Sequence, residues 1–224
     1  MTPDFETISA ILHARYSCRG YKPDPVPRET IEAIVASAQQ VPSWCNAQPW
    51  QLIITDGQET VRFREALYAH AASTPPAPDM EWPKGYPGVY GDRRRTCGFQ
   101  LYDAVGIEKG DRAASGKQML ENFRLFGAPH VAIITTPQEL GAYGGVDCGG
   151  FITAFALAAQ AQGIASIPQA AIASQAPFVR DWFDIPDDRL ILCAISFGYE
   201  DPDHPANAFR TERASPGDVI DWRS

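Results

Sequence analysis

The stretch Arg15-Tyr16-Ser17-Cys18-Arg19 places two arginines and a hydroxyl at alternate positions near the start of the chain. In an extended segment, alternate side chains leave on the same side, so Arg15, Ser17 and Arg19 are expected to face one target. Planar guanidinium groups suit phosphates and conjugated oxyanions. We interpret this stretch as one wall of a site for an anionic, aromatic cofactor, although the spacing alone also fits a solvated helix end.

A second stretch, Pro42-Ser43-Trp44-Cys45-Asn46-Ala47-Gln48-Pro49-Trp50, is punctuated by prolines and carries polar side chains that can reach a ligand. A second arginine pair, Arg210 and Arg213, lies near the other end of the chain. Either arginine pair alone is a weak signal, because exposed arginines are common. Together the two pairs can neutralise one phosphate from two sides, which suits a phosphorylated cofactor.

Periodicity places the secondary structure around these stretches. Apolar residues at helical spacing predict helices at about 2–14, 28–40, 58–72, 116–125, 143–162 and 176–183, and β-rich runs predict strands at 50–55, 128–135 and 190–198. Few strands separated by helices indicate a mixed α+β layer fold. The helix at 143–162 is apolar nearly all round, which predicts burial on every side in a central or inter-subunit position.

Residues 73–115 break this regularity. They hold many prolines and glycines, several aromatic residues and the run Arg93-Arg94-Arg95. A loop this long inside one domain is usually functional or disordered, and the aromatic content argues against disorder. We therefore expect one domain over residues 1–224 with a lid-like excursion at 73–115, containing one short helix near 96–105. The arginine run fits a solvated surface better than a ligand site.

Composition excludes several classes of protein. A net charge of −8 over 224 residues argues against binding to nucleic acid or to an anionic membrane. Five widely spaced cysteines without a C-x-x-C pattern fit a reducing compartment. The first residues lack a basic region followed by an apolar run, and the apolar run at 151–159 is shorter than the roughly 20 residues of a membrane span. We therefore expect a cytoplasmic protein.

Other catalytic signatures do not occur in the sequence. The glycines at 144–145 and 149–150 lack the dinucleotide-binding spacing, and there is no P-loop sequence. The four histidines are scattered, so we expect no metal site. No Ser/His/Asp set can be argued around Ser43.

The whole pattern resembles the FMN-dependent nitroreductase family. The resemblance rests on the two stretches quoted above and on three later segments that appear in the family's order. These are Phe126-Gly127-Ala128-Pro129-His130 at the start of a strand, Ile167-Pro168-Gln169-Ala170 after the long helix, and the segment 207–213. No single piece is specific, but the pieces cover the chain nearly end to end.

The resemblance implies a fold, a cofactor and a site. The fold would be an α+β homodimer, intertwined, with a central mixed, mostly antiparallel sheet flanked by helices and with FMN at the subunit interface. Arg15, Ser17 and Arg213 would hold the phosphate and ribityl end of FMN, and Arg19 would tune the flavin at its pyrimidine edge. The implied FMN-binding set is Arg15, Tyr16, Ser17, Arg19, Pro42, Ser43, Trp44, Asn46, Asn122, Pro168, Gln169, Ala170, Arg210 and Arg213.

The activity implied by the resemblance is oxidoreduction, with NADH or NADPH as a transient hydride donor. A nitroaromatic, quinone or similar aromatic acceptor would follow in a ping-pong cycle, and no side chain need act as acid or base. Many relatives have a small hydroxyl residue in place of Trp44 and Glu-Gly in place of Gln169-Ala170, which affects the substrate and the redox tuning. Reductive dehalogenation, ene reduction, flavin fragmentation and non-catalytic flavin binding remain open.

Overall fold

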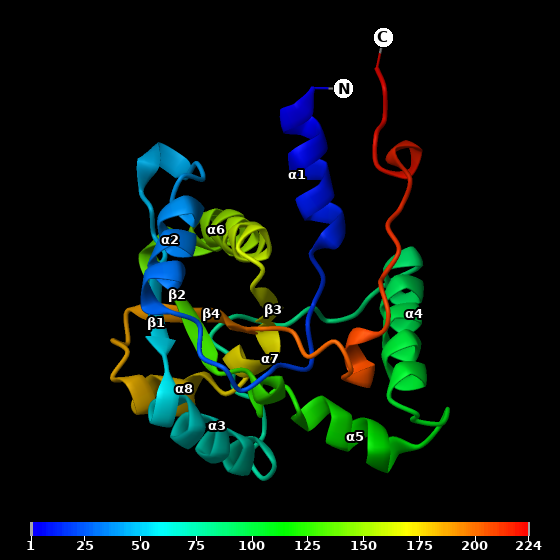
Figure 1. Cartoon of the computed structure of the whole chain (residues 1–224). Helices are drawn as coiled ribbons and strands as arrows, with labels where there is room; N and C mark the ends of the chain where they lie inside the picture. Colours follow the sequence, from blue (N-terminus) through cyan, green and yellow to red (C-terminus); the bar gives the residue numbers. More distant parts are fainter. Residues whose placement is uncertain (1, 224) are drawn as a thin grey trace.

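A computed structural model describes residues 2–223 and is built around one antiparallel sheet. Its strand order is β1-β2-β4-β3, so the two central strands, β2 and β4, are covered by neighbours on both edges (Figure 1). The strands are β1 (Gln51–Thr55), β2 (His130–Pro137), β3 (Ala165–Gln169) and β4 (Arg189–Gly198). All three strand pairs in this part of the chain are antiparallel. The sequence predicted a mixed, mostly antiparallel sheet. The one parallel pairing among the described residues is an isolated bridge from Ser17 to Ser166, outside the four strands.

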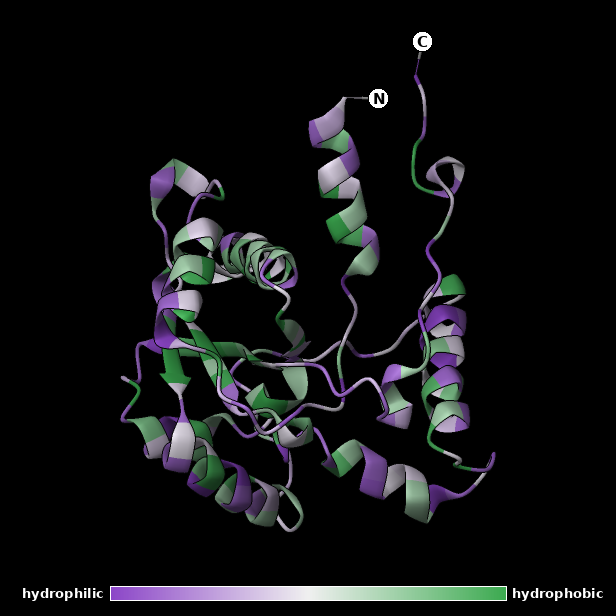
Figure 2. Ribbon diagram, in the orientation of Figure 1, coloured by the Kyte–Doolittle hydropathy of each residue, from purple (hydrophilic) through white to green (hydrophobic). Residues whose placement is uncertain are grey.

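Helices cover both faces of the sheet and extend beyond it. In Figure 1, α2 and α6 lie on one face and α3 and α8 on the other, while α4 and α5 stand to one side. Figure 2 shows hydrophobic residues concentrated in the strands between these layers. The helices are α1 (Pro3–Ala14), α2 (Arg28–Ala38), α3 (Gly57–Ala71), α4 (Val89–Ala104), α5 (Arg112–Leu120), α6 (Gly141–Ala161), α7 (Ala170–Ala173) and α8 (Ala176–Phe183).

The core is divided by the sheet into two clusters. One cluster packs α3 and α8 against the sheet through residues such as Phe63, Leu67 and Val179. The other packs α2 and α6 through residues such as Ile34 and Phe155. These apolar contacts fix the sheet whose edge strand, β3, carries the site described below.

Within one chain the long helix α6 is buried on one face only, so it does not have the central position that was one of the two expected. Its buried residues include Cys148, Phe151 and Phe155, whereas Tyr143 and Val146 are exposed. By length and composition residues 138–161 are apolar enough to cross a membrane, a test that core helices of soluble proteins also pass. Here the buried face of α6 packs against β2 and β3, so its apolar residues form part of the hydrophobic core over the sheet.

The excursion at 73–115 contains more helix than the sequence suggested. Helix α4 begins at Val89 rather than near residue 96, and it carries the Arg93–Arg95 run on its exposed surface. Arg95 pairs with Asp92 one turn away, and Arg94 lies 5.3 Å from the ring centre of Tyr86. The sequence of α4 has no regular spacing of apolar residues, so neither the full length of the helix nor the contacts of its arginines could be predicted from periodicity.

Candidate cofactor site

The chain leaves α1 in an extended conformation at Arg15 and runs beside the edge strand β3. The Cys18 N–H donates to the Ser166 carbonyl over 3.3 Å, which fixes the register of this segment against the sheet. Arg15, Ser17 and Arg19, together with Tyr16 between them, line a cavity of about 240 Å³ that also includes residues from the C-terminal part of the chain. We call this cavity the arginine cavity, and it is lined by Leu12, His13, Arg15, Tyr16, Ser17, Arg19, Cys97, Phe209, Arg210, Thr211 and Arg213.

The convergence predicted from the sequence is therefore confirmed for both arginine pairs. Arg15, Ser17 and Arg19 lie in one cavity with Arg210 and Arg213, although the pairs are far apart in sequence. Tyr16 lines the same cavity. Their roles toward a cofactor stay predictions.

Asn207 joins the two chain ends behind the arginine cavity. Its Oδ1 accepts a hydrogen bond of 2.7 Å from the Arg19 N–H, and its Nδ2 donates to the carbonyls of Gly20 and Asp201, each over 2.9 Å. The side chain is buried at 4% exposure, so all of these bonds are shielded from water. Asn207 thus holds the C-terminal segment in place before Arg210 and Arg213 follow.

The arginine cavity concentrates positive charge without carboxylate partners. Within residues 2–223, neither Arg15, Arg19, Arg210 nor Arg213 forms an ion pair. Burial lowers the pKa of Arg15, and the neighbouring Arg213 guanidinium lowers it further. Placing these arginines side by side is unfavourable because their charges repel each other. In a protein of net charge −8, such a cluster suits an anionic ligand with several acceptor oxygens, such as a phosphate.

Arg19 is the most enclosed of these arginines. Its guanidinium carbon lies 6.0 Å from the ring centre of Phe126 and 5.8 Å from that of Phe209. The Nη1 atom donates to the Ser17 carbonyl over 3.1 Å, and burial lowers the pKa of the side chain. Arginine nevertheless stays protonated in proteins, so Arg19 is a fixed cation between two aromatic rings.

Tyr16 and Arg210 form a stacked pair at the cavity wall. The Arg210 guanidinium carbon lies 3.5 Å from the Tyr16 ring centre, and the Tyr16 hydroxyl donates to Glu200. Burial, followed by this hydrogen bond, raises the pKa of Tyr16 well above its ordinary value. Tyr16 is therefore a neutral platform that orients Arg210.

A second cavity of about 430 Å³ adjoins the arginine cavity and shares Leu12, His13, Arg15 and Arg213 with it. Its further walls are Pro168 and the α6 residues Ile152, Thr153 and Ala156. Ligand pockets commonly measure about 300–1,000 Å³, so the two adjoining spaces suit a ligand larger than a phosphate alone. This cavity brings Pro168, a predicted site residue, beside the arginines.

Gln169 and Asn122, two further predicted site residues, contact each other. Gln169 Nε2 donates to the Asn122 carbonyl over 3.0 Å and to its Oδ1 over 3.2 Å, and Gln169 Oε1 accepts from the Ser196 hydroxyl. The Gln169 side chain is buried at 3% exposure and is fully engaged. It therefore positions Asn122 and β3, whereas the next residue, Ala170, is exposed.

The loop at 42–48 does not reach either cavity within one chain. Pro42, Ser43, Trp44 and Asn46 are absent from the walls of both spaces. This loop is held instead against the first turns of α6, as the next contacts show.

Trp44 anchors this loop. Its N–H lies 3.1 and 3.2 Å from the two carboxylate oxygens of Asp147, and its ring meets Tyr143 edge-on with 4.4 Å between ring centres. Cys45, Asn46 and Gln48 adopt φ angles of 51°, 58° and 48°, which are unfavourable for residues with a side chain. Strained backbone of this kind persists where surrounding contacts enforce it, often at functional sites.

Several cavity residues were missed by sequence reasoning. Cys97 reaches the arginine cavity from α4, and Phe209 and Asn207 come from the C-terminal segment. Phe209, and Asn207 behind the cavity, carried a signal only as members of the segment 207–213, whereas Cys97 carried none. Among residues 2–223 no group of three or more His, Cys, Asp or Glu side chains is placed to hold a metal ion.

Comparison with known proteins places this architecture in a family. The family model described as the Nitroreductase family matches residues 12–199, so the chain belongs to the nitroreductase family. It is 35% identical to the nitroreductase NfnB of Mycolicibacterium smegmatis, over 93% of this chain and 89% of that protein. It is 30% identical to a 4-nitrobenzoate reductase of Pseudomonas putida, over 95% of this chain and 92% of that protein.

The fold agrees with a solved structure along its whole length. The crystal structure of the FMN-dependent nitroreductase NfnB from Mycobacterium smegmatis in complex with NADPH superposes with a TM-score of 0.93 at 32% identity. The match covers 98% of this chain and 100% of that one. The α+β fold expected from the sequence is thereby confirmed.

Proposed function

We propose that this protein is an FMN-dependent NAD(P)H oxidoreductase that reduces nitroaromatic compounds, quinones or similar aromatic acceptors. The observation that carries the proposal is the arginine cavity, where unpaired guanidinium groups from both ends of the chain converge beside β3. The reaction class comes from relatives described as nitroreductases and from the structure of an FMN-dependent nitroreductase in complex with NADPH.

The residues present fit FMN. Arg15, Ser17 and Arg213 offer the donors that a phosphate and ribityl chain need, with Arg210 beside them. When bound, FMN supplies hydride transfer between a nicotinamide and an acceptor. Arg19 is a fixed cation that stabilises negative charge on a neighbouring ring, because it is held by Phe126 and Phe209 and need not reorganise.

The remaining predicted residues fall into two groups. Pro168, Gln169 and Ala170 would form the wall behind the flavin ring, with Asn122 held at its edge by Gln169. Pro42, Ser43, Trp44 and Asn46 would complete the site from a second copy of the chain, because they reach neither cavity of their own chain.

A homodimer is supported by apolar surface that one chain leaves uncovered. Helix α1 has no buried residue, and Phe5, Ile8 and Leu12 are each about half exposed on one stripe. Figure 1 shows α1 and the C-terminal tail projecting from the body, and Trp222 in that tail is 85% exposed. Apolar stripes of this kind mark interaction surfaces.

We also propose that residues 73–115 act as a lid that selects the acceptor in a cytoplasmic enzyme. Helix α4, within this excursion, places Cys97 at the arginine cavity opposite Arg19, so the excursion borders the site. No observation favours reductive dehalogenation, ene reduction, flavin fragmentation or passive flavin storage over nitroreduction.

The test is the visible spectrum of the purified protein under anaerobic conditions. We expect added FMN to be retained, its colour to bleach with NADH or NADPH, and the colour to return with 4-nitrobenzoate. Protein that stays colourless after FMN is added would overturn the cofactor assignment. Bound FMN that neither nicotinamide bleaches would instead indicate flavin binding without turnover.

A further inference from the structure

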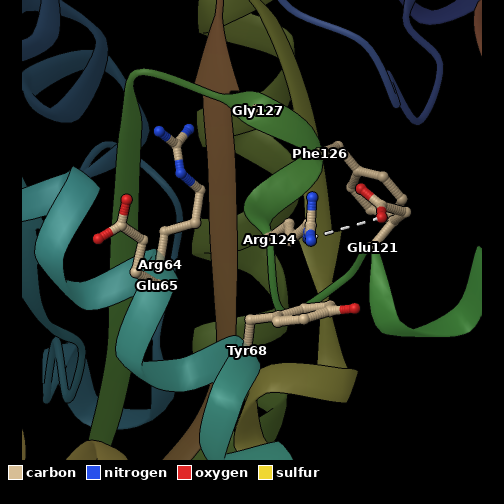
Figure 3. A pocket seen from close by; sticks show the side chains of 7 residues that line it. All are labelled: Arg64, Glu65, Tyr68, Glu121, Arg124, Phe126 and Gly127. Carbon is tan, nitrogen blue, oxygen red and sulfur yellow. Dashed lines mark ion pairs between the residues drawn. The ribbon is translucent and has the colours of Figure 1, made fainter. Parts of the chain in front are cut away.

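A second cleft, unrelated to the cavities above, opens between α3 and the turn that leads into β2. Arg64, Glu65 and Tyr68 line it from α3, and its volume is about 530 Å³. The opposite wall is formed by residues 121–127, and none of the lining residues also lines the arginine cavity. We call this space the α3 cleft (Figure 3).

Two guanidinium groups face the α3 cleft from opposite walls. Figure 3 shows Arg64 on the α3 side of the view and Arg124 on the other side, with the Tyr68 ring beneath Arg124. The Arg124 guanidinium carbon lies 4.2 Å from the Tyr68 ring centre, which orients it. Its ion pair with Glu121 is long, at 3.8 Å, so its donors are not saturated.

Arg64 has no ion pair and no side-chain hydrogen bond within residues 2–223, although Glu65 is its neighbour in sequence. Figure 3 shows the Glu65 carboxylate directed away from Arg124. Arg64 is a half-buried residue whose guanidinium lacks a carboxylate partner in the described part of the chain, although carboxylates are in excess in a protein of net charge −8. Its donors are therefore available to an anion entering the cleft.

The wall opposite α3 is a rigid, strained turn. Leu125 and Phe126 have φ angles of 57° and 51°, and Gly127 follows at 79°. Hydrogen bonds from Phe126 N to Glu121 O, 3.1 Å, and from Gly127 N to Arg124 O, 3.0 Å, hold this conformation. The turn sets Arg124 at the mouth of the cleft and the largely buried Phe126 at its wall.

The chemistry of these walls selects one class of ligand. Two guanidinium groups suit a planar carboxylate, which accepts paired hydrogen bonds from the arginine fork. Tyr68 and Phe126 provide aromatic surface beside them. The carboxylates of Glu65 and Glu121 on the same walls disfavour ligands with several negative charges.

We propose that the α3 cleft is a binding site for aromatic monocarboxylates, separate from the cofactor site, in which the carboxylate lies between Arg64 and Arg124. The two guanidinium groups of this site, Arg64 and Arg124, line neither cavity of the cofactor site, although Phe126 at the cleft wall also packs beside Arg19.

The test is isothermal titration calorimetry of the full chain with benzoate, and with benzamide as its neutral counterpart. Arg64→Gln removes the unpaired guanidinium. Arg62→Gln is the matched control, because Arg62 is exposed on the same helix and pairs with Glu59 outside the cleft. The Arg124→Gln variant probes the opposite wall.

We expect Arg64→Gln and Arg124→Gln each to weaken a benzoate site by roughly tenfold or more, the loss of a charged hydrogen bond. Arg62→Gln should bind like the wild type, and benzamide should bind about tenfold more weakly than benzoate. Because benzoate can also enter the flavin site, only a site sensitive to Arg64 counts. Equal benzoate affinity in Arg64→Gln and Arg62→Gln, equal affinity for benzamide, or no binding at all would overturn the proposal.

Discussion

The arginine cavity draws its walls from both ends of one chain, whereas the loop at 42–48 meets only the first turns of α6. In the arginine cavity, like charges are gathered and a buried asparagine fixes the backbone. In the loop, backbone strain is held by the contact between Asp147 and Trp44, and the loop residues line neither the arginine cavity nor the cavity beside it. Positive charge can thus be gathered by one chain alone, whereas the strained loop is explained by contacts to α6 and not by either cavity.

The largest expected effect concerns Asn207, on which the arginine cavity depends. Asn207→Ala leaves the Arg19 N–H and the carbonyls of Gly20 and Asp201 without their partner, so we expect the free energy of unfolding to fall by about 3 kcal/mol. Urea denaturation measures it. Asn207→Asp keeps the acceptor for the Arg19 N–H but turns an acceptor-only oxygen toward the carbonyls of Gly20 and Asp201, so it should lose at least as much stability. A clearly smaller loss than in Asn207→Ala would show that the bond to Arg19 carries most of the effect.

The next prediction separates the effect of Arg15 on FMN affinity from its effect on protein stability. Arg15→Ala should weaken FMN binding by about 2 kcal/mol, because a charged hydrogen bond is lost. Without FMN the variant should be no less stable, since the repulsion from Arg213 is relieved. Titration of FMN fluorescence gives the affinity, and thermal melts without FMN give the stability.

A matched control for this variant is Arg28→Ala on α2, whose arginine is exposed and pairs with Glu32. It should leave the FMN affinity unchanged. If Arg15→Ala binds FMN as tightly as Arg28→Ala does, the phosphate assignment is wrong.

A smaller effect is expected in the loop. Asp147→Ala removes the acceptor for the Trp44 N–H and lets the strained residues relax, so kcat/KM for a nitroarene should fall by about 1 kcal/mol of transition-state stabilisation. The free energy of FMN binding should change by less than this amount. Steady-state kinetics measure the effect, Asp147→Asn should recover part of it, and unchanged kinetics would disconnect the loop from the reaction.

The smallest expected effect is on the pH dependence of stability, through His130 at the start of β2 in the central sheet. His130 Nε2 accepts from the Val26 N–H over 2.9 Å and Nδ1–H donates to the Thr55 carbonyl over 3.1 Å, which requires a neutral ring. Burial lowers the pKa of His130 below the ordinary value of 6.5. The unfolded chain therefore binds the proton first as pH falls, and the stability from neutral His130 is lost below about pH 6.5.

Urea denaturation at about pH 7.5 and about pH 5.5 checks this titration, since the two values bracket the ordinary histidine pKa. The wild type should lose more stability over this range than His130→Gln, in which the other titrating groups are unchanged. An equal loss in both proteins would contradict the role of His130.

Local patterns predicted the elements better than their surroundings. The alternation of Arg15, Ser17 and Arg19 correctly indicated side chains directed to one cavity, because alternation is a property of the extended backbone itself. The α6 sequence was apolar nearly all round, yet the face that carries Tyr143 and Val146 is not covered within the chain, because burial depends on which elements pack against a helix.

Contacts between residues far apart in the sequence could not be predicted from local sequence patterns. Cys97 enters the arginine cavity from α4, and Asp147 caps the Trp44 N–H from α6, although neither has a local signature. The residues 165–169 were read as the exit from a helix and form the edge strand β3 instead. Strand pairing, which gives β3 its identity, is a tertiary property.

The distance along the chain between the two halves of the arginine cavity has a consequence for biosynthesis. Arg15 and Arg19 emerge from the ribosome early, whereas Arg213 follows nearly at the end of the chain. At synthesis rates of roughly 5–20 residues per second, the interval is about 10–40 s. The nascent chain therefore carries only one of the two arginine pairs during this interval, and the arginine cavity cannot form before Arg210 and Arg213 have been made.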